Sequence, residues 1–474
     1  MSFKKNFFKN ISTFAFYNYT TQGLEFLSTI ILARLLLPKE YGLVAIIAIF
    51  SGFIQLFSTL GIGTSVVRTN YGYTFHRHLY NLSIWLGVLL TLILILLAWP
   101  ISFFFSNEEL ILPTVVISFK FLFDSLSYVP YALLSKQLKF NILGSSRLAR
   151  DAFQIGLTII LAFAGFSYWS LIIPLTIGPL IQYLILYRKV NVRLRVFGWR
   201  ATLRIAYKIR SLMGNLTLNN FIKYWAGNAD RVVIGKLYTE TDLGLYNRAL
   251  RFISMTNNLI TGIFGAVLFP SLKNLMDEKG DANKEYLDIL RIITLLNMFL
   301  VIILVLFPET LVFYLWGADW MGVSPFLPYV GIILIYDSIR GTLGSLYLLY
   351  ERERYLLFTN AINSLLMVAL VIIGGMLSMM HIIRFLALGY ILITVPINMY
   401  FGFYRSFGYT IKGIFRFWLP YIAFGLSLFF AVEFEFMVLR WVLILIFMAF
   451  LLFEIRTTLG EVLNQIKKRY SQKI

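Results

Sequence analysis

The sequence predicts an all-α polytopic membrane protein with about fourteen transmembrane helices. Hydrophobic residues make up 59% of the 474 residues and charged residues only 14%, which differs strongly from the composition of soluble domains. The apolar residues form long continuous runs rather than the period-two alternation of a transmembrane β-barrel. The gaps between these runs are alternately basic and acidic or neutral.

We expect a helix wherever a long apolar run lies between two polar gaps. A run needs roughly 20 residues to cross the bilayer core, so fourteen helices leave only short loops. In chain order the expected helices cover residues 11–35, 41–66, 79–104, 111–134, 148–165, 168–188, 212–238, 242–270, 287–308, 323–348, 355–377, 382–404, 413–432 and 437–455.

The basic gaps predict the orientation of the chain. By the positive-inside rule these gaps are cytoplasmic, so both termini lie inside and the number of spans is even. The formal net charge of +19 is then explained by topology and by anionic lipid headgroups rather than by a nucleic-acid partner. The basic residues of the first three such gaps include Lys4, Lys5, Lys9, Lys136, Lys139, Arg147, Arg150, Arg188, Lys189, Arg193 and Arg195.

Matching segments about 200 residues apart predict an internal repeat of six helices. The matches are Ile31–Leu35 with Val233–Leu237, Glu40–Leu43 with Asp242–Leu245, and Phe123–Leu126 with Tyr336–Ile339. An even-numbered repeat keeps its orientation in the membrane, which places a substrate between two parallel lobes. We expect these lobes at residues 1–200 and 201–408, with two extra helices and a basic cytoplasmic tail at 409–474. Chance similarity among apolar helices is the alternative.

Ionisable residues inside the expected spans are candidate cavity residues. A charge at the centre of an isolated helix costs about 2.5–3.5 kcal/mol on insertion scales, so it needs a partner or a wet cavity. The first helix carries a polar stripe that includes Asn18, Gln22 and Glu25. The seventh and eighth helices together predict a cationic cavity between the lobes; their polar residues include Asn220, Lys223, Asp230, Arg231, Arg248 and Arg251.

The alternative interpretation is that such residues hold helices together. Asp337 and Arg340 lie three apart on one expected helix, and Lys120 and Asp124 lie four apart on another. Both spacings favour local ion pairs.

Motifs for catalysis are absent from the sequence. It contains no GxxxxGK[ST] phosphate-binding loop and no GxSxG serine. The three histidines, His76, His78 and His381, lie in loops or at span ends without metal-ligand spacing. We therefore expect neither an enzyme nor a cofactor or metal, and we favour transport.

Seven segments of the chain together form a recognisable motif set: Ile31–Pro38, Glu40–Leu43, Gly61–Gly63 with Val66–Arg68, Gly165–Leu171, Asn228–Lys236, Gly244–Ala249 and Leu268–Leu272. This set resembles the Wzx-type oligosaccharide flippases, the polysaccharide transporter branch of the multidrug/oligosaccharidyl-lipid/polysaccharide exporter superfamily. Ser167 stands where the family's GxGYWAL segment has a second glycine. The resemblance covers most of residues 1–400 and fades in the final third of the chain.

The resemblance implies a protein of the bacterial cytoplasmic (inner) membrane that works by alternating access. Family members move a polyprenyl-diphosphate-linked oligosaccharide from the inner to the outer leaflet for O-antigen, capsule or exopolysaccharide synthesis. The implied partners are this lipid-linked substrate, membrane lipids, H⁺ or Na⁺ as a coupling ion, and polysaccharide polymerase and chain-length proteins.

The resemblance also suggests roles for the polar residues. Arginine pairs with phosphate oxygens in a bidentate manner, so we expect cations of the cavity to attract the diphosphate. Substrate binding is expected at Arg248, Arg231, Lys223, Asn220 and Arg251. Gating or ion coupling is expected at Glu25, Asp230, Asp124 and Asp337.

Three other functions stay open at this point. A peptidoglycan-precursor flippase or a drug–cation antiporter of the same superfamily fits the motif set less well. A membrane polysaccharide polymerase or ligase predicts a long outer loop, which the charge map lacks. The last alternative is a structural partner of a biosynthetic complex.

Overall fold

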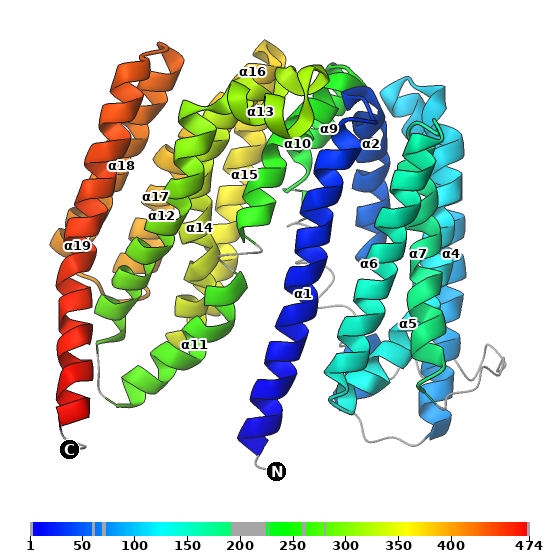
Figure 1. Cartoon of the computed structure of the whole chain (residues 1–474), viewed down its shortest axis with the longest axis horizontal. Helices are drawn as coiled ribbons and strands as arrows, with labels where there is room; N and C mark the ends of the chain where they lie inside the picture. Colours follow the sequence, from blue (N-terminus) through cyan, green and yellow to red (C-terminus); the bar gives the residue numbers. More distant parts are fainter. Residues whose placement is uncertain are drawn as a thin grey trace. The chain divides into compact units, whose positions relative to one another are not determined.

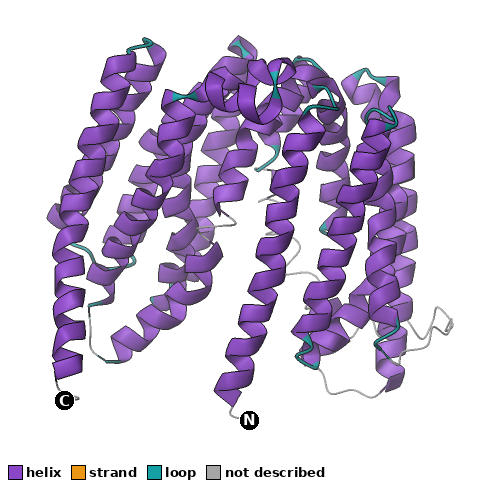
Figure 2. Ribbon diagram, in the orientation of Figure 1, coloured by secondary structure: helices purple, strands orange, loops and turns teal. Residues whose placement is uncertain are grey.

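The computed structural model of the chain describes residues 3–58, 62–68, 73–190, 224–225, 227–257, 262–278 and 281–471. All regular structure within these ranges is helical (Figure 2), and nine of the described helices are long and apolar enough to cross a membrane. The total of fourteen stays a prediction, because nearly half of the expected helix at 212–238 lies outside the described residues. The chain divides into two compact units, Met1–Gly244 and Leu245–Ile474.

The first unit is a bundle of long helices joined by short turns. Its elements are α1 (Phe3–Ala33), α2 (Pro38–Gln55), α3 (Ile62–Arg68), α4 (Tyr73–Phe105), η1 (Glu108–Leu110), α5 (Ile111–Lys136), α6 (Phe140–Phe163), α7 (Trp169–Tyr187) and α9 (Ala229–Leu237). Helix α4 packs on α5, α5 on α7, α6 on α7 and on α1, and α3 on α5 (Figure 1).

Small and hydroxylated residues bring α4 and α5 together. The hydroxyl of Ser83 donates to the Ser125 carbonyl at 3.0 Å, and that of Thr91 donates to the Ser118 carbonyl at 3.0 Å. Between these two bonds a side chain at Gly87 would overlap Ser125. This arrangement is typical of helix pairs in membranes, where small residues allow close backbone approach and hydroxyls bond across helices.

The structure changes the interpretation of two helices of the first unit, α2 and α6. The expected helix at 41–66 is interrupted, because α2 ends at Gln55 and a turn follows. There the Ser58 hydroxyl donates to the Gln55 carbonyl at 2.7 Å and satisfies an acceptor at the helix end. Helix α6 begins at Phe140, before the expected span at 148–165. Arg147 and Arg150, assigned above to a cytoplasmic gap, therefore lie within a helix.

The second unit surrounds one central helix. Helix α14 is buried at every residue from Leu327 to Ile339 and packs on α11, α12, α16 and α18. The elements of this unit are α10 (Glu240–Thr256, from the unit boundary), α11 (Gly262–Asp277), α12 (Ala282–Leu306), α13 (Pro308–Trp316), η3 (Ala318–Phe326), α14 (Leu327–Leu349), α15 (Glu353–Leu377), α16 (Met379–Gly389), η4 (Tyr390–Thr394), α17 (Val395–Ile397), η5 (Asn398–Tyr404), α18 (Ile411–Glu433) and α19 (Met437–Ser471).

The span from Met379 to Tyr404 is wound irregularly. Two π-helical stretches, η4 and η5, flank the single turn of α17. Pro396 lies in that turn and provides no backbone N–H, which favours a local change of winding. The Asn398 side chain donates to the Thr394 carbonyl at 2.8 Å. Such π-bulges occur often at functional sites.

The two C-terminal helices, α18 and α19, are part of the second unit (Figure 1). Helix α19 packs on α12 and α18 on α14. Arg291 of α12 forms an ion pair with Glu454 of α19 at 2.8 Å, and the Tyr336 hydroxyl of α14 donates to the Tyr421 carbonyl of α18 at 2.7 Å.

Candidate functional site

A buried carboxylate is the centre of the polar cluster in the second unit. Asp337 on α14 is only 3% exposed. Its oxygens accept hydrogen bonds from Asn257 at 2.6 Å, from the Tyr390 hydroxyl at 2.9 Å, and from Arg340 at 2.6 and 2.9 Å. The ion pair predicted from the spacing of Asp337 and Arg340 is therefore confirmed.

This cluster joins three elements that are distant in the sequence. Asn257 follows the last residue of α10, Asp337 and Arg340 belong to α14, and Tyr390 begins the π-helical stretch η4. A charged carboxylate is stable at such depth only when donors surround it. The side chain of Arg340 is 43% exposed, so the cluster extends from the buried Asp337 to the surface of the helix bundle.

The matching carboxylate of the first unit, Asp124 on α5, has different neighbours. The cations that act on it most strongly are Lys120 and Arg150. One turn further along α5, the Tyr128 hydroxyl accepts a hydrogen bond from the Gln55 side chain at 2.8 Å. Asp124 thus lies between cations from α5 and α6.

A second ionic network of the first unit lies on α6 and α7. Arg150 contacts Asp151 at 2.8 Å and donates to the Gln182 side chain of α7 at 2.9 Å. Arg147 contacts Asp151 at 3.7 Å and donates to Asn18 on α1 at 3.3 Å. The polar stripe of α1 therefore meets α6 at Asn18. This network was not predicted from the sequence, because both arginines were assigned to a cytoplasmic gap, although Arg150 also falls within the expected helix at 148–165.

Arg248 of α10 is held between two aromatic rings. It is 6% exposed, and its guanidinium lies 4.8 Å from the centre of the Trp316 ring and 4.5 Å from that of Trp320. A cation on an indole face is attracted by the ring quadrupole. Arg251, one turn further on, is exposed.

The other predicted cations lie near the start of α9. Arg231 is half-buried, and its guanidinium donates to the Asn228 side chain at 2.7 Å. The Asp230 carboxylate accepts from the backbone N–H of Arg231 at 2.8 Å, where a negative charge at a helix N-terminus is favourable.

Glu25 on α1 is half-buried. Asn220 and Lys223 lie outside the described residues.

The repeat-matched glycines Gly42 and Gly244 lie at a close contact within the first unit, between α2 and the first residues of α10, which precede the unit boundary. A side chain at Gly42 would overlap the backbone carbonyl of Glu240, and one at Gly244 would overlap that of Pro38. The contact is reciprocal, because Pro38 precedes Gly42 by the same four residues that separate Glu240 from Gly244. The Glu240 carboxylate also accepts from Asn107 at 2.7 Å.

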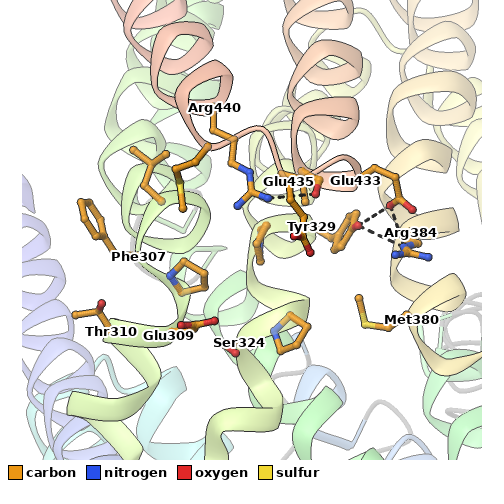
Figure 3. Close-up of a pocket in the computed structure, with 16 residues that line it drawn as sticks. Phe307, Glu309, Thr310, Ser324, Tyr329, Met380, Arg384, Glu433, Glu435 and Arg440 are labelled. Carbon is orange, nitrogen blue, oxygen red and sulfur yellow. Dashed lines mark hydrogen bonds and ion pairs between the residues drawn. The ribbon is translucent and has the colours of Figure 1, made fainter.

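A cavity of about 610 Å³ opens at the turn between α18 and α19 (Figure 3). Glu433 at its rim accepts from the Tyr329 hydroxyl at 2.7 Å and pairs with Arg384 at 3.0 Å. Nothing in the sequence pattern predicted this cavity, because its residues come from α13, α14, α16 and the α18–α19 turn. The short charged stretch Glu433–Glu435 between two apolar helices is the one local signal.

Comparison with known proteins gives a consistent family assignment. Residues 31–325 match the family described as "Polysaccharide biosynthesis protein". The chain is 25% identical over 311 residues to the succinoglycan biosynthesis transport protein ExoT of Rhizobium meliloti (strain 1021), spanning 65% of this chain and 62% of ExoT. It is 23% identical over 367 residues to the lipopolysaccharide biosynthesis protein WzxC of Escherichia coli (strain K12), spanning 75% and 72%.

The fold is also that of a solved transporter structure. The lipid II flippase MurJ in an inward closed conformation superposes with a TM-score of 0.70 at 14% sequence identity. The superposition covers 93% of this chain and 99% of MurJ. At this identity the likeness concerns the fold alone.

Proposed function

The chain belongs to the family of polysaccharide biosynthesis proteins, and we propose that it is a flippase for a polyprenyl-diphosphate-linked oligosaccharide. The glycan would move from the inner to the outer leaflet of the bacterial cytoplasmic membrane for surface polysaccharide synthesis. The family match carries this proposal, and the roles of ExoT in succinoglycan transport and of WzxC in lipopolysaccharide biosynthesis support it. These two relatives serve different polymers, so the proposal specifies the lipid carrier and not the sugar sequence.

Alternating access between two repeated lobes is the proposed mechanism. The helix pairings of the two units support the repeat. A shift of about 200 residues carries four packed helix pairs of the first unit onto packed pairs of the second. The pair α4–α5 corresponds to α12–α14, α5–α7 to α14–α16, α6–α7 to α15–α16, and α3–α5 to α11–α14. A parallel repeat of six helices per lobe would place the substrate path between the lobes. The helices α18 and α19 would move with the second lobe.

The proposed diphosphate contacts are the cations around α9 and α10. Arg231 is the central residue, since its guanidinium is positioned by Asn228 and arginine binds phosphate in a bidentate manner. Lys223, Asn220 and Arg251 would complete the set. Arg248 lies between two indoles, so we assign it mainly to positioning α10 beside α13.

Four carboxylates are the proposed elements of gating or ion coupling. Asp337 has donors from three elements, so protonating it or replacing its partners would loosen α10, α14 and η4 together. Asp124, Glu25 and Asp230 are the corresponding candidates in the first unit. H⁺ or Na⁺ would be the coupling ion, and polymerase and chain-length proteins would use the exported glycan.

Deletion of the gene tests the proposed function. In the deletion strain we expect polyprenyl-linked glycan to accumulate on the cytoplasmic leaflet, detected by its accessibility to a glycan-binding probe in inverted and right-side-out vesicles. Accumulation of a peptidoglycan precursor would instead favour the alternative of a peptidoglycan-precursor flippase. Normal outward delivery of all lipid-linked glycans would contradict flipping of either substrate.

A further inference from the structure

The cavity at the α18–α19 turn combines fixed polar groups with exposed carboxylates. Glu433, Tyr329 and Arg384 hold one another through the hydrogen bond and ion pair described above, and the Arg384 guanidinium lies 5.9 Å from the Tyr329 ring centre. Arg440 is 8% exposed and donates to the carbonyls of Ala431 and Val432 at 3.1 and 3.2 Å. It therefore caps the C-terminal end of α18.

Two other carboxylates line the same cavity. Glu309 in the first turn of α13 and Glu435 in the α18–α19 turn are both exposed. Figure 3 shows Glu309 and Met380 on opposite sides of the space. Three prolines, Pro308, Pro325 and Pro328, form further parts of the wall. Proline has a fixed φ and no N–H, so these parts are rigid and apolar.

We propose that this cavity binds a sugar unit of the exported glycan. Sugar hydroxyls donate to carboxylates and accept from arginine, and the apolar face of a sugar ring packs on tyrosine and proline. The volume lies within the roughly 300–1,000 Å³ range of small-molecule pockets. The inference rests on the proposed flippase function and extends it to a second binding site, lined by other residues than the cations of α9 and α10.

Charge favours a sugar over a lipid phosphate at this site. The cavity contains the carboxylates of Glu309, Glu433 and Glu435 against the two arginines. Arg384 is paired with Glu433, and Arg440 is bound to backbone carbonyls. The three carboxylates outnumber the two arginines, so an anionic headgroup would meet a net negative charge, which is unfavourable in a partly desolvated space. The cavity lies at the end of α19 opposite the chain's C-terminus (Figure 1), which is the outer end in the predicted orientation.

Site-specific photo-crosslinking tests the inference in the full-length protein. The benzophenone amino acid p-benzoyl-phenylalanine would replace Met380 in cells that make the glycan, and adducts would be identified by mass spectrometry after irradiation. We expect a sugar-containing adduct. The matched control is the same replacement of Met376 on α15, which is 76% exposed, and there we expect phospholipid adducts. The inference would be overturned if export were intact and both positions gave phospholipid adducts without any sugar-containing adduct.

A second variant tests the chemistry of recognition. Glu309→Gln keeps the shape of an exposed side chain and removes its charge. We expect the sugar adduct at position 380 to fall about tenfold, the order expected for losing a hydrogen bond to a charged group. Glu353→Gln, an exposed glutamate in the first turn of α15, is the control and leaves the adduct unchanged.

The two experiments separate this inference from the proposed function. If the deletion strain accumulates glycan on the inner leaflet but no sugar adduct forms at position 380, the flippase stands and the second site falls. If no lipid-linked glycan accumulates in the deletion strain, the proposed function itself falls.

Discussion

At the scale of single residues, Asp337 and Arg291 illustrate how ionised side chains are held within the second unit. Asp337 accepts hydrogen bonds from Asn257, Tyr390 and Arg340, and Arg291 contacts both Asp288 and Glu454. Each charge thus has one partner on its own helix and at least one on another. Partners of this kind reduce the cost of desolvation and also fix how neighbouring helices pack.

Replacing Asp337 with asparagine should destabilise the protein. Asp337→Asn removes the charge that Arg340 contacts, while the side chain of Arg340 is only partly enclosed by protein. We therefore expect a loss of about 1.5–3 kcal/mol, the range for hydrogen bonds to charged groups, rather than the larger cost of a fully buried orphan charge. Thermal unfolding of the purified protein measures it. The control is the double variant Asp337→Asn with Arg340→Gln. The prediction is refuted if both the single and the double variant unfold at the same temperature as the parent protein.

Arg248 and Arg251 form a matched pair for testing cation–π stabilisation. Arg248→Met keeps a long flexible side chain but loses the charge between Trp316 and Trp320. Such contacts contribute about 0.5–2 kcal/mol each, so we expect a lower unfolding temperature for Arg248→Met. The exposed Arg251→Met should unfold like the parent. Equal unfolding temperatures for the two variants would show that the indoles do not stabilise the cation.

Spacing along one helix predicted the local contact of the candidate site but not its other partners. The three-residue separation of Asp337 and Arg340 was sufficient to predict their ion pair. The hydrogen bonds from Asn257 and Tyr390 to Asp337 depend on how three elements pack together, and no local sequence pattern predicts that packing. The aromatic neighbours of Arg248 were missed for the same reason, since Trp316 and Trp320 lie some 70 residues further along the chain.

At the scale of elements, hydropathy predicted where helices occur better than where their winding changes. The expected span at 355–377 corresponds to α15, Glu353–Leu377, and that at 437–455 lies within α19. The break after Gln55 and the π-helical stretches around Pro396 were missed. A break of this kind removes only a few hydrogen bonds and hardly changes the apolar pattern on which the prediction rests.

The close contact between α2 and α10 predicts that two glycines are essential for packing. Gly42→Ala and Gly244→Ala would each place a methyl group against backbone rather than against a movable side chain. Overpacking typically costs about 1–3 kcal/mol, and here the helices must separate to relieve it. Thermal unfolding and the amount of folded protein in the membrane are the measurements. Gly156→Ala, which meets no atom within 4 Å, is the control and should be neutral or stabilising, because alanine favours helix.

At the scale of the whole molecule, the sequence predicted a repeat of helices, and the two units have corresponding helix pairings. The division at 1–200, 201–408 and 409–474 stays a prediction. The units defined by packing are Met1–Gly244 and Leu245–Ile474, so the latter includes α18 and α19. Three contacts connect this terminal pair to the rest of the unit. Glu454 contacts α12, the Tyr421 carbonyl contacts α14, and Glu433 contacts α16. Such contacts depend on tertiary packing and lie outside the repeated pattern.

The absence of cysteine from the sequence makes the predicted orientation directly testable, because each introduced thiol is unique. With both termini cytoplasmic, the acidic α18–α19 turn faces outward and the α14–α15 turn, followed by Arg352 and Arg354, faces inward. We expect Glu435→Cys to react with a membrane-impermeant maleimide in intact spheroplasts. Glu351→Cys should react only after the membrane is permeabilised. Both residues are exposed turn positions with positive φ, so their local environments are comparable. The reverse labelling pattern would invert the orientation and with it the outward position of the proposed sugar cavity.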